Sequence, residues 1–317
     1  MAAAIALSRR GRGLSTPNPN VGCLIVRDGR VVGRGWTRPG GRPHAEAQAL
    51  DQASDRARGA CCYVTLEPCF HLSPRGPRCA DLIARAGIAR VVIGLRDPDP
   101  RTDGQSAAWL RDQGIAVEMG VMADEAAGAM AGFILRQTRG RPQVTLKLGL
   151  SLDGRIARPD GQSQWITGPA ARAHAHVERA MHDAILVGGG TLRADAPRLD
   201  VRLPGLTHRS PRRLVLTGGA APDGWERIGS PDAIAALERV DHLLVEGGAR
   251  TAAAFLRAGL VDRLLLYRAP ILIGDGLAAV GDIGLADLAD AHGRWRMIDD
   301  RMLGDDRLEV YEALRGA

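Results

Sequence analysis

Four side chains in the first half of the sequence could form a catalytic metal site. His44 and Glu46 belong to the run His-Ala-Glu, Cys69 ends the run Glu-Pro-Cys, and Cys79 lies further along. One imidazole and two thiolates suit Zn²⁺, and three protein ligands leave a fourth position open for water. Glu46 is free to carry a proton from that water to a leaving amine. The pattern is typical of zinc-dependent deamination of a nucleobase, and we expect an amino-pyrimidine as the substrate.

The spacing of the two cysteines departs from the usual form of this pattern. Nine residues separate Cys69 from Cys79, where zinc nucleobase deaminases commonly have two. Cys79 opens a predicted helix, whose N-terminus favours a thiolate. The intervening FHLSPRGPR is therefore predicted to be an insertion at the mouth of the site. The other cysteines, Cys23, Cys61 and Cys62, lie in predicted strands and are expected to be buried.

Composition indicates a folded protein of two domains. The chain has 317 residues, of which 45% are hydrophobic and 25% charged. No run approaches the roughly 18 apolar residues of a membrane span. The N-terminus places apolar residues before basic ones, the reverse of a signal peptide, and predicts a first helix. With five cysteines and no such signal, we expect a cytoplasmic protein without disulfides or a membrane partner.

The positive charge has two interpretations. A net charge of +6 suits nucleic acid or a phosphorylated small molecule. An aromatic content of 3% weakens the first, because single-strand binders stack bases on aromatic rings. Lys147 is the single lysine of the chain and lies in the apolar run TLKLGL. It could be an edge-strand lysine that discourages aggregation, or it could lie in a second active-site cleft.

Alternating strand and helix patterns place these residues in two α/β domains, 1–141 and 142–317, joined at the Gly- and Pro-containing stretch 138–142. In the second domain, the glycine-rich turns 188–190 and 246–248 follow strands. They could bring backbone N–H groups to phosphates or be ordinary tight turns. The predicted strands are 21–26, 31–36, 61–66, 90–94, 115–119, 144–150, 184–187, 213–217, 242–246, 263–267 and an antiparallel 308–311, and the predicted helices are 44–53, 79–85, 105–112, 124–136, 170–181 and 251–258.

Longer motifs give a resemblance that covers essentially the whole chain. It is carried by TPNPNVGCLIV, PHAEAQAL and YVTLEPCF, then by LKLGLSLDGRIA, SQWITGPAAR, GGGTLRADAPRLDVR and VEGGARTAAAFLRAGLVDRLLLYRAP. These resemble the RibD family of bifunctional riboflavin-biosynthesis enzymes. The resemblance implies a cytidine-deaminase-like α/β/α layered domain followed by a dihydrofolate-reductase-like α/β domain. It implies zinc-dependent deamination of 2,5-diamino-6-ribosylamino-4(3H)-pyrimidinone 5′-phosphate, then NADPH-dependent reduction of the ribosyl group to ribityl.

The resemblance also assigns roles to residues. His44, Cys69 and Cys79 would bind zinc, and Glu46 would shuttle protons. The family's inter-cysteine loop is one residue shorter and carries paired histidines, of which this chain keeps only His71; Arg75 and Arg78 remain candidate phosphate ligands there. The substrates would contact Asn18, Asn20, Lys147, Ser163, Arg179, Leu199, Arg202 and Glu246, and the cofactor would contact Leu150, Trp165, Thr191, Asp195, Gly248, Ala249, Arg250, Thr251, Ala252, Ala253 and Ala254.

Two alternatives stay open at this point. The chain could deaminate nucleic-acid bases with a non-catalytic second domain, or its zinc could be purely structural. Asn18 and Asn20 could also be residues of a simple Pro/Asn turn. Our leading interpretation expects phosphorylated pyrimidines as partners, no nucleic acid, and leaves a homo-oligomer open.

Overall fold

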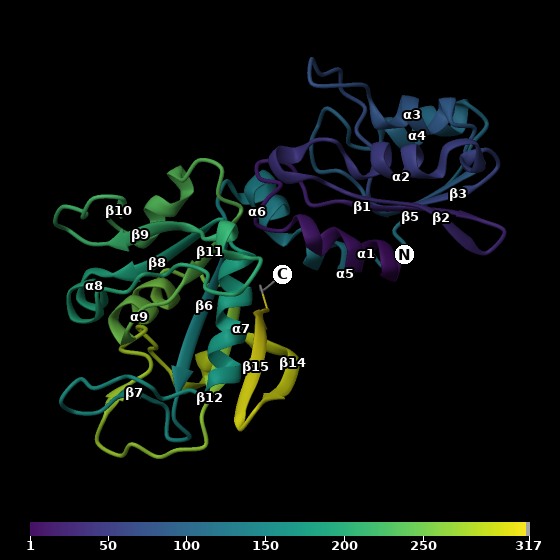
Figure 1. Ribbon diagram of the computed structural model, residues 1–317. Helices are drawn as coiled ribbons and strands as arrows, with labels where there is room; N and C mark the ends of the chain where they lie inside the picture. Colours follow the sequence, from purple (N-terminus) through teal and green to yellow (C-terminus); the bar gives the residue numbers. More distant parts are fainter. Residues whose placement is uncertain (315–317) are drawn as a thin grey trace. The chain divides into compact units, whose positions relative to one another are not determined.

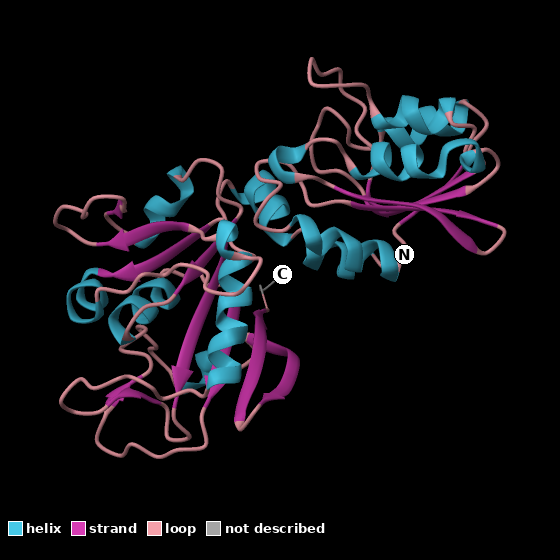
Figure 2. Cartoon of the chain, viewed as in Figure 1, coloured by secondary structure: helices cyan, strands magenta, loops and turns pink. Residues whose placement is uncertain are grey.

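A computed structural model describes residues 1–314 of the chain. The chain forms two compact units, and the boundary between them along the sequence lies between Gly140 and Arg141 (Figures 1 and 2). Each unit has its own sheet and its own buried apolar core. No helix among the described residues is long and apolar enough to cross a membrane.

The first unit is a three-layer α/β/α structure. Its elements are α1 (Ala2–Ser8), β1 (Gly22–Arg27), β2 (Arg30–Trp36), α2 (Ala45–Ala53), β3 (Cys61–Leu66), α3 (Cys79–Arg85), β4 (Arg90–Leu95), α4 (Gln105–Asp112), β5 (Ala116–Met119), α5 (Ala123–Ala129) and α6 (Ala131–Arg139). The sheet order is β2-β1-β3-β4-β5, with β1 antiparallel to both neighbours and the rest parallel. Helices α2, α3 and α4 cover one face and α1 and α5 the other (Figure 1).

Close packing of α2 on the sheet fixes the start of that helix. A side-chain carbon at Gly33 would lie 2.0 Å from the carbonyl oxygen of Ala49, and one at Gly35 would lie 1.9 Å from that of Ala45. The helix face toward the sheet is correspondingly made of fully buried alanines. Because small residues on both sides allow this approach, His44, the residue before α2, is held at a defined position near the sheet.

The second unit contains an eight-stranded sheet. Its elements are β6 (Gln143–Leu150), β7 (Arg155–Ala157), α7 (Pro169–Ala180), β8 (Ala184–Gly188), α8 (Gly189–Asp195), β9 (Arg212–Leu216), β10 (Glu226–Ile228), β11 (His242–Val245), α9 (Ala249–Arg257), β12 (Arg263–Arg268), β13 (Leu277–Ala278), β14 (Trp295–Leu303) and β15 (Asp306–Ala313). The order is β10-β9-β8-β11-β6-β12-β15-β14. All pairs are parallel except β12–β15 and β14–β15, and β7 and β13 form a separate antiparallel pair.

Strand alternation separates the two faces of this sheet. On β6, Val144, Leu146 and Leu148 pack in the core with Phe255 of α9. Lys147 points to the opposite face, where its register partner on β12 is Leu265, which packs against α7. Because β6 lies between β11 and β12, the edge-strand interpretation of Lys147 is wrong.

Several elements differ from the sequence prediction. The helix predicted over 124–136 is two helices, separated at Met130, whose backbone is not helical (φ −113°, ψ 18°). The last strand is antiparallel as predicted, but its hairpin partner β14 was missed, as were β7, β10, β13 and α8. Short 3₁₀ helices also connect the elements, at Arg9–Gly11, Pro39–Gly41, Ser54–Ala57, Thr207–Arg209, Pro231–Ala236 and Leu288–Ala291.

Candidate active sites

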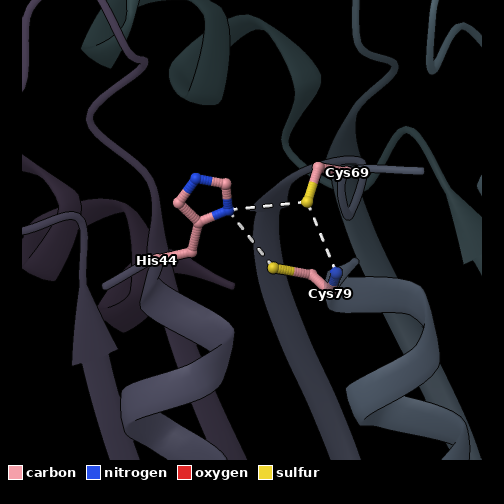
Figure 3. A group of neighbouring side chains, drawn as sticks. All are labelled: His44, Cys69 and Cys79. Carbon is pink, nitrogen blue, oxygen red and sulfur yellow. Dashed lines mark hydrogen bonds between the residues drawn. The ribbon is translucent and has the colours of Figure 1, made fainter. Parts of the chain in front are cut away.

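Three side chains of the first unit converge as a metal-binding group. The ligand atoms of His44, Cys69 and Cys79 all lie within 4.8 Å of one another (Figure 3). Nδ1 of His44 lies 3.3 Å from Sγ of Cys79 and 3.5 Å from Sγ of Cys69. Each ligand stands at an element boundary: His44 precedes α2, Cys69 follows β3, and Cys79 is the first residue of α3. One imidazole and two thiolates fit zinc with a position left for water.

The electrostatics of the group favour a thiolate at Cys69. Hydrogen bonding from the Cys79 thiol, supported by His44, lowers the pKa of Cys69 to about 4. The backbone N–H of Cys79 also donates to Sγ of Cys69, at 3.3 Å. A thiolate is the form that binds a metal, so one ligand is already prepared for zinc.

Two buried glutamates near the metal-binding group have different environments. Glu46 is 3% exposed, and burial raises the pKa of its carboxyl group. Glu67, also buried, accepts hydrogen bonds from the Ser106 hydroxyl and from the backbone N–H groups of Gly104 and Ala107. Glu67 therefore caps the start of α4 and anchors the segment that carries Cys69. Among residues 1–314, Glu46 has no cationic hydrogen-bond partner, which suits a group that gains and loses a proton.

A cavity of about 260 Å³ opens beside the metal-binding group. Asn18, His44, Glu46 and Cys69 line it. Asn20 does not: its amide donates to the backbone carbonyls of Ala129, at 3.0 Å, and Ser8, at 3.4 Å. The structure thus gives Asn20 a packing role, and the predicted substrate contact of this residue is not supported.

Other residues of this cavity were not found from the sequence. Arg42, Asp97 and Arg101 line it together with His71 and Arg75 of the inter-cysteine loop. Burial raises the pKa of Asp97 to about 7. The only sequence signal was the run Asp-Pro-Asp-Pro at positions 97–100, which follows a strand and reads equally well as a turn. Arg78, by contrast, pairs with Asp81 at 2.9 Å and does not line this cavity.

The second unit has a cavity of about 520 Å³ on the Lys147 face of the sheet. It brings together residues that lie far apart along the chain, from Lys147 on β6 to Glu246 after β11. The segment between β7 and α7 supplies Trp165, which is 66% exposed and lies under the Arg172 guanidinium, 4.8 Å from the ring centroid. The sequence predicted the following of its lining residues: Lys147, Ser163, Trp165, Arg179, Asp195, Leu199, Arg202 and Glu246.

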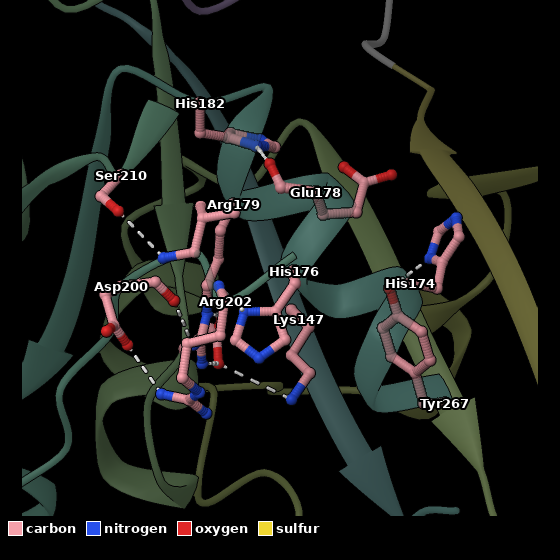
Figure 4. Close-up of polar contacts among 12 residues, drawn as sticks. Lys147, His174, His176, Glu178, Arg179, His182, Asp200, Arg202, Ser210 and Tyr267 are labelled. Atoms are coloured by element: carbon pink, nitrogen blue, oxygen red, sulfur yellow. Dashed lines mark hydrogen bonds and ion pairs between the residues drawn. The ribbon is translucent and has the colours of Figure 1, made fainter. Parts of the chain in front are cut away.

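Glu246 is the centre of a charge network in this cavity (Figure 4 shows its cationic neighbours). Arg179 donates to its two carboxylate oxygens, at 2.8 and 2.9 Å, and the Lys147 ammonium lies 3.7 Å away. Burial alone would raise the pKa of Glu246, but the charges of Lys147 and Arg179 outweigh it and lower the pKa to about 2. Arg202 pairs separately with Asp200, at 2.7 Å. Arg179 is therefore largely neutralised, whereas Lys147 keeps donors for a further anion.

The predicted cofactor residues divide into two groups. Trp165 and Asp195 line the cavity. Leu150, Thr191 and the turn and helix start 248–254 do not, and Ala252, on α9, is fully buried in the core. The two glycine-rich turns nevertheless meet, because Thr191 Oγ1 accepts a hydrogen bond from the Gly248 N–H at 3.3 Å. A side-chain carbon at Gly190 would meet nothing within 4 Å, so the turn leaves open space that a phosphorylated cofactor could enter.

Known proteins match both units. The cytidine and deoxycytidylate deaminase zinc-binding region matches residues 1–95, and the RibD C-terminal domain matches residues 142–224 and 225–302. The riboflavin biosynthesis protein RibD of Escherichia coli is 38% identical over 96% of each chain. That of Mycobacterium tuberculosis H37Rv is 39% identical over 97% of this chain and 95% of its own. The chain belongs to the RibD family.

A solved structure agrees over nearly the whole length. The crystal structure of a diaminohydroxyphosphoribosylaminopyrimidine deaminase/5-amino-6-(5-phosphoribosylamino)uracil reductase from Thermotoga maritima superposes with a TM-score of 0.89. It is 32% identical and covers 99% of this chain and 97% of its own. The predicted fold class is confirmed: a cytidine-deaminase-like unit precedes a dihydrofolate-reductase-like unit. Zinc and NADPH are the cofactors of this pair of domains.

Proposed function

We propose that this chain carries out two successive steps of riboflavin biosynthesis. The first unit deaminates 2,5-diamino-6-ribosylamino-4(3H)-pyrimidinone 5′-phosphate, and the second reduces the ribosyl group of the product to ribityl. The convergence of His44, Cys69 and Cys79 beside the buried Glu46, in a cavity of small-molecule size, carries the proposal. Residues 1–141 would form the deaminase domain and 142–317 the reductase domain.

In the deaminase site, this chain's own residues manage the proton. When bound by His44, Cys69 and Cys79, zinc supplies the Lewis acidity that makes water a nucleophile. The Glu46 carboxylate takes a proton as water adds to the 2-amino carbon of the pyrimidine. It then protonates the amine, which leaves as ammonia while the ring keeps the oxygen. The raised pKa of Glu46 favours both directions of this transfer.

In the reductase site, cations and an aromatic ring hold the substrate. NADPH supplies the hydride when bound. In this proposal Lys147 and Arg202 bind the sugar phosphate, and Arg179 keeps the Glu246 carboxylate charged; the ion pairs of Lys147 and Arg179 with Glu246 and of Arg202 with Asp200 support it. Trp165 stands at the cavity with most of its surface exposed and can cover a bound ring.

The proposed partners are phosphorylated pyrimidines, with no nucleic-acid partner and a cytoplasmic location. The cavity in each unit, of about 260 and 520 Å³, and the RibD relationship support this over deamination of nucleic-acid bases. A purely structural zinc site would not require a buried carboxyl group and an open cavity beside the metal. A homo-oligomer is compatible with the proposal but is not required by either cavity.

Metal analysis and two assays on the purified protein test the proposal. We expect about one zinc per chain, release of ammonia from the diamino substrate, and oxidation of NADPH with the deaminated substrate. Zinc without either activity would instead support a structural metal, and deamination of single-stranded nucleic acid would support the base-deaminating alternative.

A further inference from the structure

The Lys147 side chain has a defined position in the cavity of the second unit. Its ammonium nitrogen lies 3.9 Å from the place that a side-chain carbon of Gly149 would occupy, so the chain extends along β6 to a residue without a side chain. Gly149 is paired in register with Tyr267 of β12, and the ammonium lies 5.7 Å from the centre of the Tyr267 ring. Glu246, which follows β11 on the other side of β6, lies 3.7 Å away. The ammonium is therefore held between a carboxylate and an aromatic ring.

Tyr267 supports Lys147 from behind the cavity. It does not line the cavity and is only 1% exposed. Its ring packs in a small core with Ala175 of α7 and Leu308 of β15. Its hydroxyl group lies 2.8 Å from Nδ1 of His174, also on α7 (Figure 4). The ring is thus fixed at its hydroxyl end while one of its faces meets the ammonium.

His174 connects this ring to the hairpin formed by β14 and β15. Nη2 of Arg301, on β14, lies 3.0 Å from Nε2 of His174. Because a guanidinium can only donate, Nε2 accepts, and Nδ1 carries the proton that His174 donates to Tyr267. Burial lowers the pKa of His174, which favours this neutral form. No residue of β14 or β15 among residues 1–314 lines the cavity, so this series of contacts links the hairpin to Lys147 from outside it.

We propose that Tyr267 is a positioning residue of the reductase, which holds the Lys147 ammonium ready for the substrate phosphate, and that His174 and Arg301 fix the Tyr267 ring. A free lysine side chain is flexible, and ordering it when the phosphate binds would cost affinity. The ring and Glu246 restrict the ammonium before the substrate arrives. The inference rests on the proposed role of Lys147 in binding the phosphate and adds the residues that support it.

A double-mutant cycle with ribose 5-phosphate tests the inference without turnover. Calorimetric titration of the full-length protein compares Tyr267→Leu, Lys147→Ala and the variant that carries both substitutions. We expect Tyr267→Leu to weaken binding about three- to thirtyfold, the range of a cation–π contact. In the Lys147→Ala background the same substitution should change the dissociation constant by less than about twofold, because its effect passes through Lys147. Tyr267→Phe keeps the ring and should lose less than Tyr267→Leu.

Arg301→Ala tests the link to the hairpin at an exposed position. Loss of the hydrogen bond to His174 should loosen the Tyr267 ring and weaken ribose 5-phosphate binding about two- to fivefold. The matched control is Arg296→Ala on the same strand, which loses an ion pair with Glu312 and should leave binding unchanged. Equal binding by these two variants would overturn the role assigned to His174 and Arg301.

Phe255→Leu is the matched control for loss of the ring, because Phe255 is fully buried against the opposite face of the same sheet. It should lower thermal stability, as Tyr267→Leu does, without changing the dissociation constant. Equal weakening by these two variants, or a full effect of Tyr267→Leu in the Lys147→Ala background, would overturn the inference. Binding that does not depend on Lys147 would overturn it too. Absence of NADPH oxidation with the deaminated substrate, with the cycle as expected, would instead remove the proposed reductase function.

Discussion

The buried Glu46 and Glu67 and the half-buried Glu246 show how environment decides what a carboxyl group does in this protein. Glu67 is held by hydrogen bonds from the start of α4 and positions Cys69. Glu246 is held ionised by Arg179 and Lys147. Glu46 is buried beside the metal-binding group, and burial raises its pKa. Glu46 therefore combines access to the cavity with a raised pKa that suits proton transfer.

Glu46→Gln should separate metal binding from deamination. The amide keeps the size of the carboxyl group but cannot carry a proton, so the deamination rate should fall about 10²- to 10⁴-fold. Zinc content should stay at the level of the unmodified protein, because Glu46 is not a ligand. Measuring ammonia release and zinc on the same preparation checks both; a loss of zinc would show that Glu46 supports the metal site instead.

Lys147→Arg should impair the reductase. The ammonium group lies 3.7 Å from Glu246 in a partly buried position, where a larger planar guanidinium would displace both the carboxylate and a bound phosphate. We expect kcat/KM for reduction to fall by about ten- to a hundredfold while deamination is unchanged. Steady-state NADPH oxidation measures the effect, and unchanged kinetics would remove Lys147 from the site.

The residue types and spacing were sufficient to predict the metal-binding group but not the pairing around Glu246. His44, Cys69 and Cys79 stand at element boundaries, and such positions follow from strand and helix patterns. The Arg179–Glu246 pair joins α7 to the end of β11, and nothing local connects those two segments. Asn20 was predicted to contact the pyrimidine, whereas its amide donates to the backbone carbonyl of Ala129, a tertiary contact that the loop sequence does not indicate.

At the scale of elements, the approach of α2 to β2 positions the first zinc ligand. Positions 33 and 35 must be glycine for this contact, because any side-chain carbon there would displace the helix. The alternating pattern of the strands predicted the sheet, but the helix-to-sheet distance depends on tertiary contacts. The same limit applies to the hairpin β14–β15: β14 is mostly exposed, so its sequence lacks the apolar alternation that identifies a strand.

Gly35→Ala should therefore weaken both the first unit and its zinc site. The added methyl would lie 1.9 Å from the Ala45 carbonyl oxygen, so α2 must shift and carry His44 with it. We expect a loss of about 1–3 kcal/mol of stability and a weaker hold on zinc, measured by thermal unfolding and by competition with a chelator.

Gly128→Ala provides the matched control, because a methyl at this helical position meets nothing within 4 Å. It should leave zinc affinity unchanged and stability unchanged or slightly higher. If Gly35→Ala behaved like this control, the close contact between α2 and the sheet would not be what positions His44.

At the scale of the whole molecule, the two proposed sites belong to separate units. The core of the first unit is built from residues 5–133, and the cores of the second from residues 144–310, with no residue in common. The metal-binding group lies entirely in the first unit, and the Lys147–Glu246 network entirely in the second. The sequence was sufficient to predict this division. Each half has its own alternating strand and helix patterns and its own motifs that resemble the RibD family.

Removal of zinc tests this division most directly. A chelator should stop ammonia release from the diamino substrate and, with it, NADPH oxidation that depends on that substrate. When the deaminated substrate is supplied instead, the chelated protein should oxidise NADPH at the rate of the untreated protein. Equal loss of NADPH oxidation with both substrates would contradict the assignment of the two reactions to two independent sites.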